Sequence, residues 1–222
     1  AVADADTVLV LEDDTYAGFT MKSGVPVLVD PGINAIIDAG AANVAVQFPY
    51  NISASTVLRG FTIRGGSVAV VDMDGGGKLV DCTIDSDGDA TDYGIYHAGS
   101  ASVIDSCTVI LDGTGVTSVG IYLSDSYASL AHTTVEILSG TSSDWGIFIT
   151  SDLSGEPTVS ECFVSVPDGS GIYCDDGSVS ATTVDGTDGY GIEAVGDGLA
   201  ANCIIPNASG GYEAGGGSSH FN

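Results

Sequence analysis

The chain has 222 residues, 44% of them hydrophobic, and its 30 Asp and Glu residues against 4 Lys and Arg give a formal net charge of −26. This composition is too apolar for a disordered acidic tail, and no apolar run approaches the roughly 18 residues of a membrane span. The shortage of cations excludes binding to nucleic acid or to anionic membrane surfaces.

The N-terminal 55 residues predict strands at Val8–Leu11, Val25–Val29 and Val44–Val46, with turn residues between them. The opening residues Ala1–Asp6 do not resemble a signal peptide. They would suit a mature secreted chain after cleavage at a small-residue site.

From residue 56 onward, two short segments alternate with a spacing of 20–29 residues between like copies. The first type starts mostly with Cys or Thr and occurs at 61–63, 82–84, 107–109, 133–135, 162–164, 182–184 and 203–205. The second type starts with Gly and occurs at 94–97, 120–123, 146–149, 171–174 and 191–194, with a decayed copy at 211–214. Both types are β-branched and alternating, so each predicts a strand.

Strand pairs that recur at this period, separated by irregular loops, indicate a solenoid rather than a sandwich. We therefore predict one all-β domain, a right-handed single-stranded parallel β-helix of roughly eight or nine coils. Residues 1–55 would form the N-terminal coils, 56–205 the regular coils, and 206–222 a tail or cap.

Several segments resemble the opening of the pectate-lyase-like β-helix superfamily, and especially the β-helix repeat proteins of bacterial and archaeal cell surfaces. They are Thr15-Tyr16, Met21–Val25, Ile36–Asp38 and Thr56–Ile63. The recurring Cys-Thr-Ile and Gly-Ile-Tyr segments extend the resemblance over most of the chain. It implies the fold but no single activity, because this superfamily holds lyases, hydrolases, epimerases, adhesins and structural proteins.

Alternation along each strand predicts which side chains face inward. The inner ladders would be a Cys/Thr ladder, an aliphatic ladder that runs from Ile63 to Ile205, and an isoleucine ladder at 95, 121, 147, 172 and 192. His97 and Cys174 also fall at inward positions, so a core histidine is favoured over a catalytic one.

The five cysteines form neither a CxxC pair nor a Cys/His cluster, so a zinc site is not expected. Cys82 and Cys107 on adjacent coils would lie close enough for a disulfide, but parallel side chains strain the required dihedral angle. Buried free thiols are the preferred interpretation. An odd cysteine count leaves one candidate for an intermolecular bridge, Cys203 near the C-terminal end.

Two ladders are expected on the outer surface. Threonines at 62, 83, 108, 134 and 183 form the first, interrupted by Phe163, and their mixed partner positions do not make an ice-binding face. Tyr96, Tyr122, Phe148 and Tyr173 form the second, an exposed aromatic stripe. Such a stripe would bind sugar rings or pack against a subunit or a loop.

Acidic loops are the candidate metal sites. The densest loop holds Asp85, Asp87, Asp89 and Asp92, and a later turn holds Asp175 and Asp176. Hard cations such as Ca²⁺ bind several oxygen ligands, yet the first loop departs from an EF-hand in its glycine and in Tyr96 at position twelve. Calcium binding and solvated acidic turns remain as alternatives.

No complete catalytic set is present. The lyase and hydrolase patterns of this superfamily need a cationic base or a Gly-His-Gly set. Here the candidate bases Arg59 and Arg64 lie several coils from Asp175 and Asp176. A strongly acidic surface would also repel a polyuronate unless calcium bridged the two.

These observations favour a non-catalytic structural protein of the cell exterior, such as a surface layer, sheath, filament or adhesin module, that self-associates through solenoid edges or faces. The alternative is a polysaccharide lyase, hydrolase or glycan-binding module, with calcium as its cofactor. Sequons at Asn51 and Asn207 would carry glycans on a secreted chain.

Overall fold

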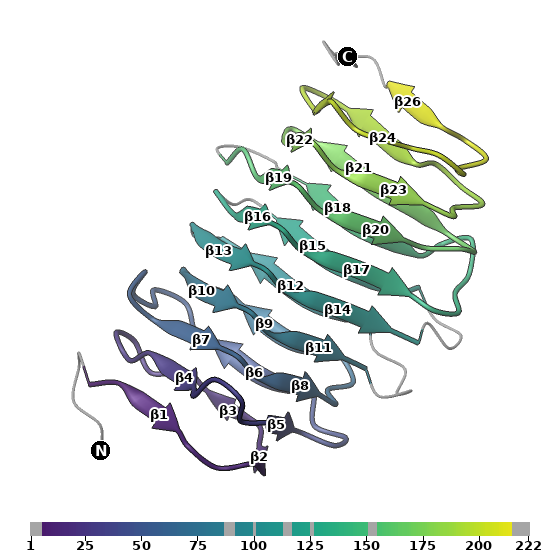
Figure 1. Cartoon of the computed structure of the whole chain (residues 1–222). Coiled ribbons are helices and arrows are strands. Elements are labelled where there is room, and N and C mark those ends of the chain that lie inside the picture. The colour runs from purple at the N-terminus through teal and green to yellow at the C-terminus, as the bar shows by residue number, and fades with distance from the viewer. Residues whose placement is uncertain are drawn as a thin grey trace.

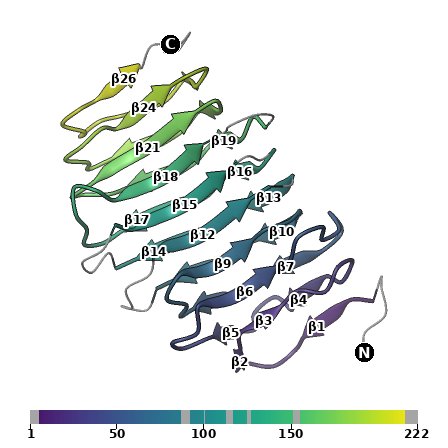
Figure 2. The ribbon, with the colours of Figure 1, turned by 180° about the vertical axis from the view of Figure 1, so that it is seen from behind.

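The computed structural model describes residues 6–86, 92–99, 101–112, 117–124, 127–150 and 155–214, which form 26 β-strands in three parallel sheets. Each coil of the chain adds one strand to sheet A, then one to sheet B, then one to sheet C. The coils stack into a parallel β-helix with the N-terminus at one end and the C-terminus at the other (Figures 1 and 2). The predicted fold is confirmed.

Sheets A and C have nine described strands each, and sheet B has eight. Sheet A comprises β1 (Val8–Val10), β4 (Val27–Val29), β7 (Val57–Arg59), β10 (Gly77–Val80), β13 (Ser102–Asp105), β16 (Ser129–Ala131), β19 (Thr158–Ser160), β22 (Ser178–Ser180) and β25 (Leu199–Ala201). Sheet B comprises β2 (Asp14–Ala17), β5 (Ala35–Asp38), β8 (Thr62–Arg64), β11 (Thr83–Asp85), β14 (Thr108–Leu111), β17 (Thr134–Ile137), β20 (Phe163–Ser165) and β23 (Thr183–Asp185). Sheet C comprises β3 (Phe19–Thr20), β6 (Val44–Phe48), β9 (Ala69–Met73), β12 (Tyr93–Ala98), β15 (Val119–Ser124), β18 (Trp145–Thr150), β21 (Ser170–Asp175), β24 (Ile192–Val195) and β26 (Tyr212–Ala214).

Like residues pair with like in neighbouring coils, which confirms the predicted ladders. Thr83 pairs with Thr62 on one side and Thr108 on the other, and Ile121 pairs with Ile95 and Ile147. The inward isoleucines of sheet C are fully buried, as are His97 and Cys174. The inner ladders therefore form one continuous hydrophobic core along the axis.

The corner between sheets A and B is a single residue in the left-handed region of φ. This residue is Gly60, Asp81, Ser106, His132, Glu161, Ala181 or Asn202 in successive coils. The next residue in the last six of these coils is Cys or Thr, and its side chain donates to the carbonyl two residues earlier. The distances are 3.3 Å from Cys82 Sγ to Val80 O and 2.9 Å from Thr133 Oγ1 to Ala131 O.

The corner between sheets B and C is a ladder of tightly packed glycines. A Cβ atom on Gly146 would lie 2.3 Å from Val164 Cγ1 and 2.8 Å from the carbonyl oxygen of Gly171. Gly94, Gly120, Gly171 and Gly191 are equally crowded. The glycine that opens each Gly-Ile-Tyr segment is therefore required by close approach of the backbone of the next coil.

The structure contains, in its described residues, no helix that is long and apolar enough to cross a membrane.

Candidate functional site

The outer face of sheet C carries a stack of aromatic rings. Tyr96, Tyr122, Phe148 and Tyr173 are in register on β12, β15, β18 and β21. Their ring centroids are 5.2, 5.8 and 4.4 Å apart from one coil to the next, with interplanar angles of 3°, 8° and 10°. The predicted aromatic ladder is confirmed as a face-to-face stack.

Two further rings, which the sequence interpretation missed, complete this surface. Tyr93 packs edge-on against Tyr96 and Tyr122, at 5.1 and 5.4 Å, and Trp145 packs edge-on against Phe148 and Tyr173, at 5.7 and 5.6 Å. We call these six residues the aromatic stripe. Because its rings pack on one another, each of them is only partly exposed.

The crowded glycine explains why the two extra rings face outward. Gly94 and Ile95 are both buried, so strict alternation slips by one residue between Tyr93 and Tyr96. The same slip occurs at Gly146, which separates Trp145 from the stack position at Phe148. A regular two-residue period would have placed Tyr93 and Trp145 on the inner face. The repeated glycine before each isoleucine is the signal that could have located them.

Carboxylates bracket the aromatic stripe at both ends of the same column. Asp72 precedes Tyr96 on β9, and Glu193 follows Tyr173 on β24. Burial, with repulsion from Asp74, raises the pKa of Asp72 to about 6. Burial, with repulsion from Glu213 in the next coil, raises the pKa of Glu193 as well. Each end of the stripe thus holds two acids close enough to repel.

The tyrosines of the stripe are hydrogen-bond donors at neutral pH. Burial raises the pKa of Tyr93, of Tyr96 and of Tyr173 above the ordinary value of 10. Their hydroxyl groups therefore remain protonated, and each can both donate and accept a hydrogen bond. The stripe accordingly offers apolar ring edges with a polar rim.

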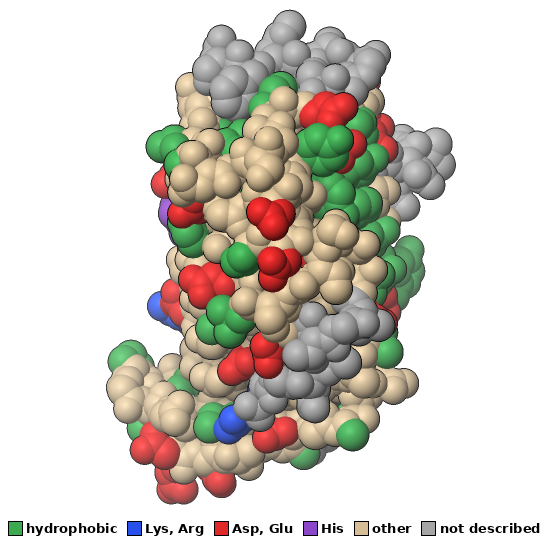
Figure 3. All heavy atoms as spheres, turned by 90° about the vertical axis from the view of Figure 1, so that its right-hand side faces the viewer, with side chains coloured by type: hydrophobic (Ala, Val, Ile, Leu, Met, Phe, Trp, Pro, Cys, Tyr) green, Lys and Arg blue, Asp and Glu red, His purple; other side chains and the backbone are tan. Residues whose placement is uncertain are grey.

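The described strands of sheet C contain four carboxylates, Asp72, Asp175, Glu193 and Glu213, and neither Lys nor Arg. On the adjoining side of the molecule, acidic side chains extend along the helix whereas basic ones lie only in the lower half of the view (Figure 3). The described strands of sheet C therefore carry acidic side chains and no Lys or Arg.

The structure describes only some of the predicted calcium ligands. Asp87 and Asp89 lie outside the described residues. Among the described residues, no group of three or more His, Cys, Asp or Glu is placed to hold a metal ion. The carboxylate of Asp176 instead accepts the amide of Asp197 at 2.8 Å, as part of a turn. Calcium binding at the acidic loops stays a prediction.

All five cysteines are free thiols. Cys82 and Cys107 lie on adjacent coils without a bridge, which agrees with the preferred interpretation. Their role differs from that of simple hydrophobic residues, because each thiol donates to a corner carbonyl. Cys203 is only half-buried, and its thiol donates to Ala201 O at 3.4 Å. An intermolecular bridge through Cys203 stays a prediction.

Both predicted glycosylation sites are on the surface. Asn51 is exposed in a turn with φ of 63°. Asn207 is also exposed, and its side-chain amide donates to the carboxylate of Asp185 at 2.5 Å. A glycan on Asn207 would be attached to the nitrogen atom that makes this contact. Glycosylation at either residue stays a prediction.

A histidine bonded to two carboxylates lies on the opposite side of the coil, at the corner of sheets A and B. His132 Nδ1 is 2.8 Å from Asp105, and its Nε2 is 3.3 Å from Glu161, so this histidine joins three coils. The hydrogen bond with Asp105 raises the pKa of His132. The three residues join neighbouring coils at an exposed corner of the surface.

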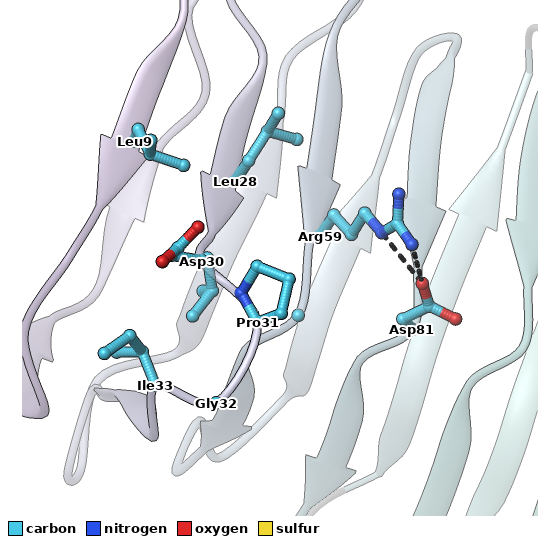
Figure 4. A pocket seen from close by; sticks show the side chains of 10 residues that line it. Leu9, Leu28, Asp30, Pro31, Gly32, Ile33, Arg59 and Asp81 are labelled. Atoms are coloured by element: carbon cyan, nitrogen blue, oxygen red, sulfur yellow. Dashed lines mark hydrogen bonds and ion pairs between the residues drawn. The ribbon is translucent and has the colours of Figure 1, made fainter.

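A hollow of about 470 Å³ lies on the outer face of sheet A near the N-terminal end. Leu9, Leu28 and Arg59 lie in register along its floor, and the turn from Asp30 to Ile33 forms its wall (Figure 4). Arg59 is bound to Asp81 through Nε and Nη2, at 2.8 and 2.7 Å. The guanidinium is thus neutralised, and this hollow is remote from the aromatic stripe on sheet C.

Comparison with known proteins establishes the fold. No protein-family model and no curated sequence matches the chain. Its structure is similar to that of pectate lyase Pel9A, with a TM-score of 0.70 and 12% identity over 100% of this chain and 70% of the lyase. It is also similar to the Dettilon tailspike protein, with a TM-score of 0.63 and 16% identity over 89% of this chain and 43% of the tailspike.

A third similar structure is an alginate lyase from Paenibacillus, with a TM-score of 0.54 and 12% identity over 98% of this chain and 93% of the lyase. The chain spans less than half of the tailspike. Identities this low carry no residue-level correspondence. The similar structures therefore define a pectate-lyase-like parallel β-helix fold, and any activity has to be argued from this chain's own residues.

Proposed function

We propose that this protein is an extracellular module that binds a polysaccharide along the outer face of sheet C and does not cleave it. The observation that carries the proposal is the aromatic stripe, six partly exposed rings on four consecutive coils. Soluble proteins seldom leave so many aromatic side chains on one face unless that face has a partner. The two lyases among the similar structures act on polysaccharides according to their names.

The geometry of the rings defines how a glycan would lie on the stripe. Tyr96, Tyr122, Phe148 and Tyr173 cover one another's faces, so a sugar ring cannot stack flat on any inner member. The free surface consists of ring edges and hydroxyl groups that repeat at each coil, about 4.8 Å apart. A polymer extended along the helix axis could place its C–H groups on the edges and its hydroxyls at the phenols.

The absence of cleavage is proposed because the described strands of sheet C hold no Lys or Arg that could serve as a cationic base. Arg59 belongs to sheet A and is bound to Asp81 at 2.7 Å, and Arg64 belongs to sheet B with Asp38 at 3.6 Å. Both guanidinium groups project from other faces of the coil. A lyase reaction on sheet C that used a cationic base would therefore need that base from elsewhere.

The single tryptophan of the chain, Trp145, provides the test because it belongs to the stripe. We expect its fluorescence to change on titration with a glycan that binds, and Tyr122→Thr to weaken that binding at least tenfold. Phe163→Thr is the matched control, since it removes an exposed aromatic ring from the Thr ladder of sheet B. If a broad glycan panel leaves the fluorescence and the heat of mixing unchanged, the proposal is wrong.

Self-association into a structural assembly is a second candidate. The observation that favours it is the pair of open ends, where strand edges lack a neighbour among the described residues. Leu9 and Leu11 are exposed at the first coil, and Leu199 and Ile204 at the last. Light scattering that detects concentration-dependent polymers, abolished by Leu11→Asp or Ile204→Asp, would support it. A monomer at every concentration would rule it out.

A further inference from the structure

The charge of sheet C suggests which sugars the stripe would take. One outward column of sheet C runs from coil to coil through Gln47, Asp72, the stacked rings, Glu193 and Glu213. Acids thus stand at both ends of an aromatic surface. A uronate polymer laid along this column would bring its carboxylates to these acids with no described cation between them.

We propose that the aromatic stripe binds a polysaccharide whose sugars carry protonated amino groups, with ammonium groups paired to Asp72 and Glu193. This inference rests on the proposed function and specifies its ligand. The two named lyases act on polymers of the opposite charge, pectate and alginate.

The distance between Asp72 and Glu193 allows one ligand to pair with both carboxylates. Asp72 and Glu193 lie in the same outward column on β9 and β24, five coil spacings apart, or about 24 Å. An extended oligosaccharide of several sugars can span this length along the helix axis. Its central sugars would then lie on the ring edges of Tyr122 and Phe148.

Repulsion within each pair of acids also supports binding of an ammonium group. Asp72 lies beside Asp74, and Glu193 lies beside Glu213, so each pair repels when both members are ionised. A bound ammonium group would neutralise that repulsion, whereas a neutral sugar would not. An ammonium group near Tyr96 or Tyr173 would also gain attraction from the ring. Binding and the relief of repulsion therefore favour the same ligand.

Chemistry offers a matched pair of probes for this test. A glucosamine hexamer and an N-acetylglucosamine hexamer share backbone and length, and the acetyl groups of the second convert its charged amino groups into neutral amides. Hexagalacturonate is the anionic counterpart. At pH 6 and low salt, calorimetry of the whole chain should show the glucosamine hexamer binding at least tenfold more tightly than the acetylated one, with no binding of the uronate.

Two double variants test whether Asp72 and Glu193 cause the preference for the glucosamine hexamer. Asp72→Asn combined with Glu193→Gln should lower affinity for the glucosamine hexamer at least tenfold and leave that for the acetylated hexamer unchanged. Glu12→Gln combined with Glu156→Gln makes the same change in net charge at exposed turns away from the stripe. It should leave the selectivity intact. Circular dichroism and Trp145 fluorescence would verify that both double variants fold.

The calorimetry distinguishes polysaccharide binding in general from a preference for charged amino sugars. If no hexamer binds, the proposed function fails. If the acetylated or anionic hexamer binds as tightly as the glucosamine hexamer, the polysaccharide role stands and this inference is overturned. Selectivity that survives in the Asp72/Glu193 variant but falls in the Glu12/Glu156 variant would also overturn it, since overall charge would then be the cause.

Discussion

The thiol of Cys162 donates a hydrogen bond to the backbone carbonyl of Ser160, two residues earlier, over 3.2 Å. In the next coil the hydroxyl of Thr182 does the same for Ser180 over 2.9 Å. Each donor directly follows the left-handed corner residue between sheets A and B. In the six coils from Cys82 to Cys203 this position therefore holds a short side chain with a donor at the γ atom, which both Cys and Thr supply.

We expect Cys162→Thr to fold with nearly unchanged stability, because Thr133 and Thr182 fill the same position in the coils on either side. Cys162→Val has the shape of threonine but lacks the donor, so it should be less stable than Cys162→Thr by about 1 kcal/mol. Denaturant unfolding of the two variants measures the difference. Equal stability would mean that volume alone, and not the hydrogen bond, selects the residue.

The buried thiols should resist modification in the folded chain. Burial raises the pKa of Cys82 to about 11 and that of Cys174 to about 12, so almost no thiolate forms at pH 8. Labelling with a thiol reagent at that pH should be slow, and Cys203, which is half-buried, should react first. In denaturant all five should react at once. Fewer than five reactive thiols after unfolding would instead reveal a disulfide.

Gly146→Ala should destabilise the fold by about 3 kcal/mol or more, since its Cβ would overlap both Val164 and the backbone of Gly171. Gly40→Ala is the control, because nothing lies within 4 Å of a Cβ there and its φ of 53° is the only obstacle. That substitution should cost about 1 kcal/mol. Thermal unfolding would compare them, and equal losses would contradict the crowding argument.

A buried aspartate fixes the loop that delivers Trp145 to the stripe. Asp144 is fully buried and accepts the amide of Ser118 at 2.6 Å and the amide of Thr141. Asp144→Ala would leave both amides without this acceptor and should cost about 3 kcal/mol. It should also shift the Trp145 emission. Asp168→Ala, at an exposed turn, should change stability by less than about 0.5 kcal/mol.

Much of the fold follows from the sequence because a solenoid repeats one local rule. Alternation within each short segment correctly assigned the inner ladders, and spacing placed like residues on like. The buried position of His97 was predicted from alternation alone and is confirmed. The ladders and the burial of His97 depend on residues one coil away, and the repeat in the sequence identifies those residues.

The site was predicted less completely because two rings of the stripe do not follow the two-residue period. Tyr93 and Trp145 face outward only because the adjacent glycine packs against the next coil, and that contact becomes visible in three dimensions. The role of the Cys/Thr ladder was missed for a similar reason. The carbonyl that each side chain bonds also accepts the amide of the corner residue in the preceding coil. The left-handed backbone at that corner has no residue pattern to predict it, since Asp, Ser, His, Glu and Ala all occupy it.

The pKa of Asp72 gives a pH-dependent prediction. It rises from the ordinary value of 3.8 to about 6 in the folded chain, through burial and the charge of Asp74. The folded state therefore holds this proton more tightly than the unfolded chain does. Folding is favoured by the protonated group below about pH 4, and that advantage is lost as the pH rises through 6.

Asp72→Asn removes this dependence while keeping the shape of the side chain. The variant should match the parent chain at pH 4 and exceed it in stability at pH 8, by about 1–2 kcal/mol after allowance for solvent screening of a partly exposed group. Glu12→Gln removes one exposed charge elsewhere and controls for the net charge of the chain. Asp74→Asn should act in the same direction by lowering the pKa of Asp72, which NMR titration can follow. If the stability difference between Asp72→Asn and the parent stays constant from pH 4 to 8, then Asp72 does not titrate near 6, and the repulsion between the acids at this end of the stripe is absent.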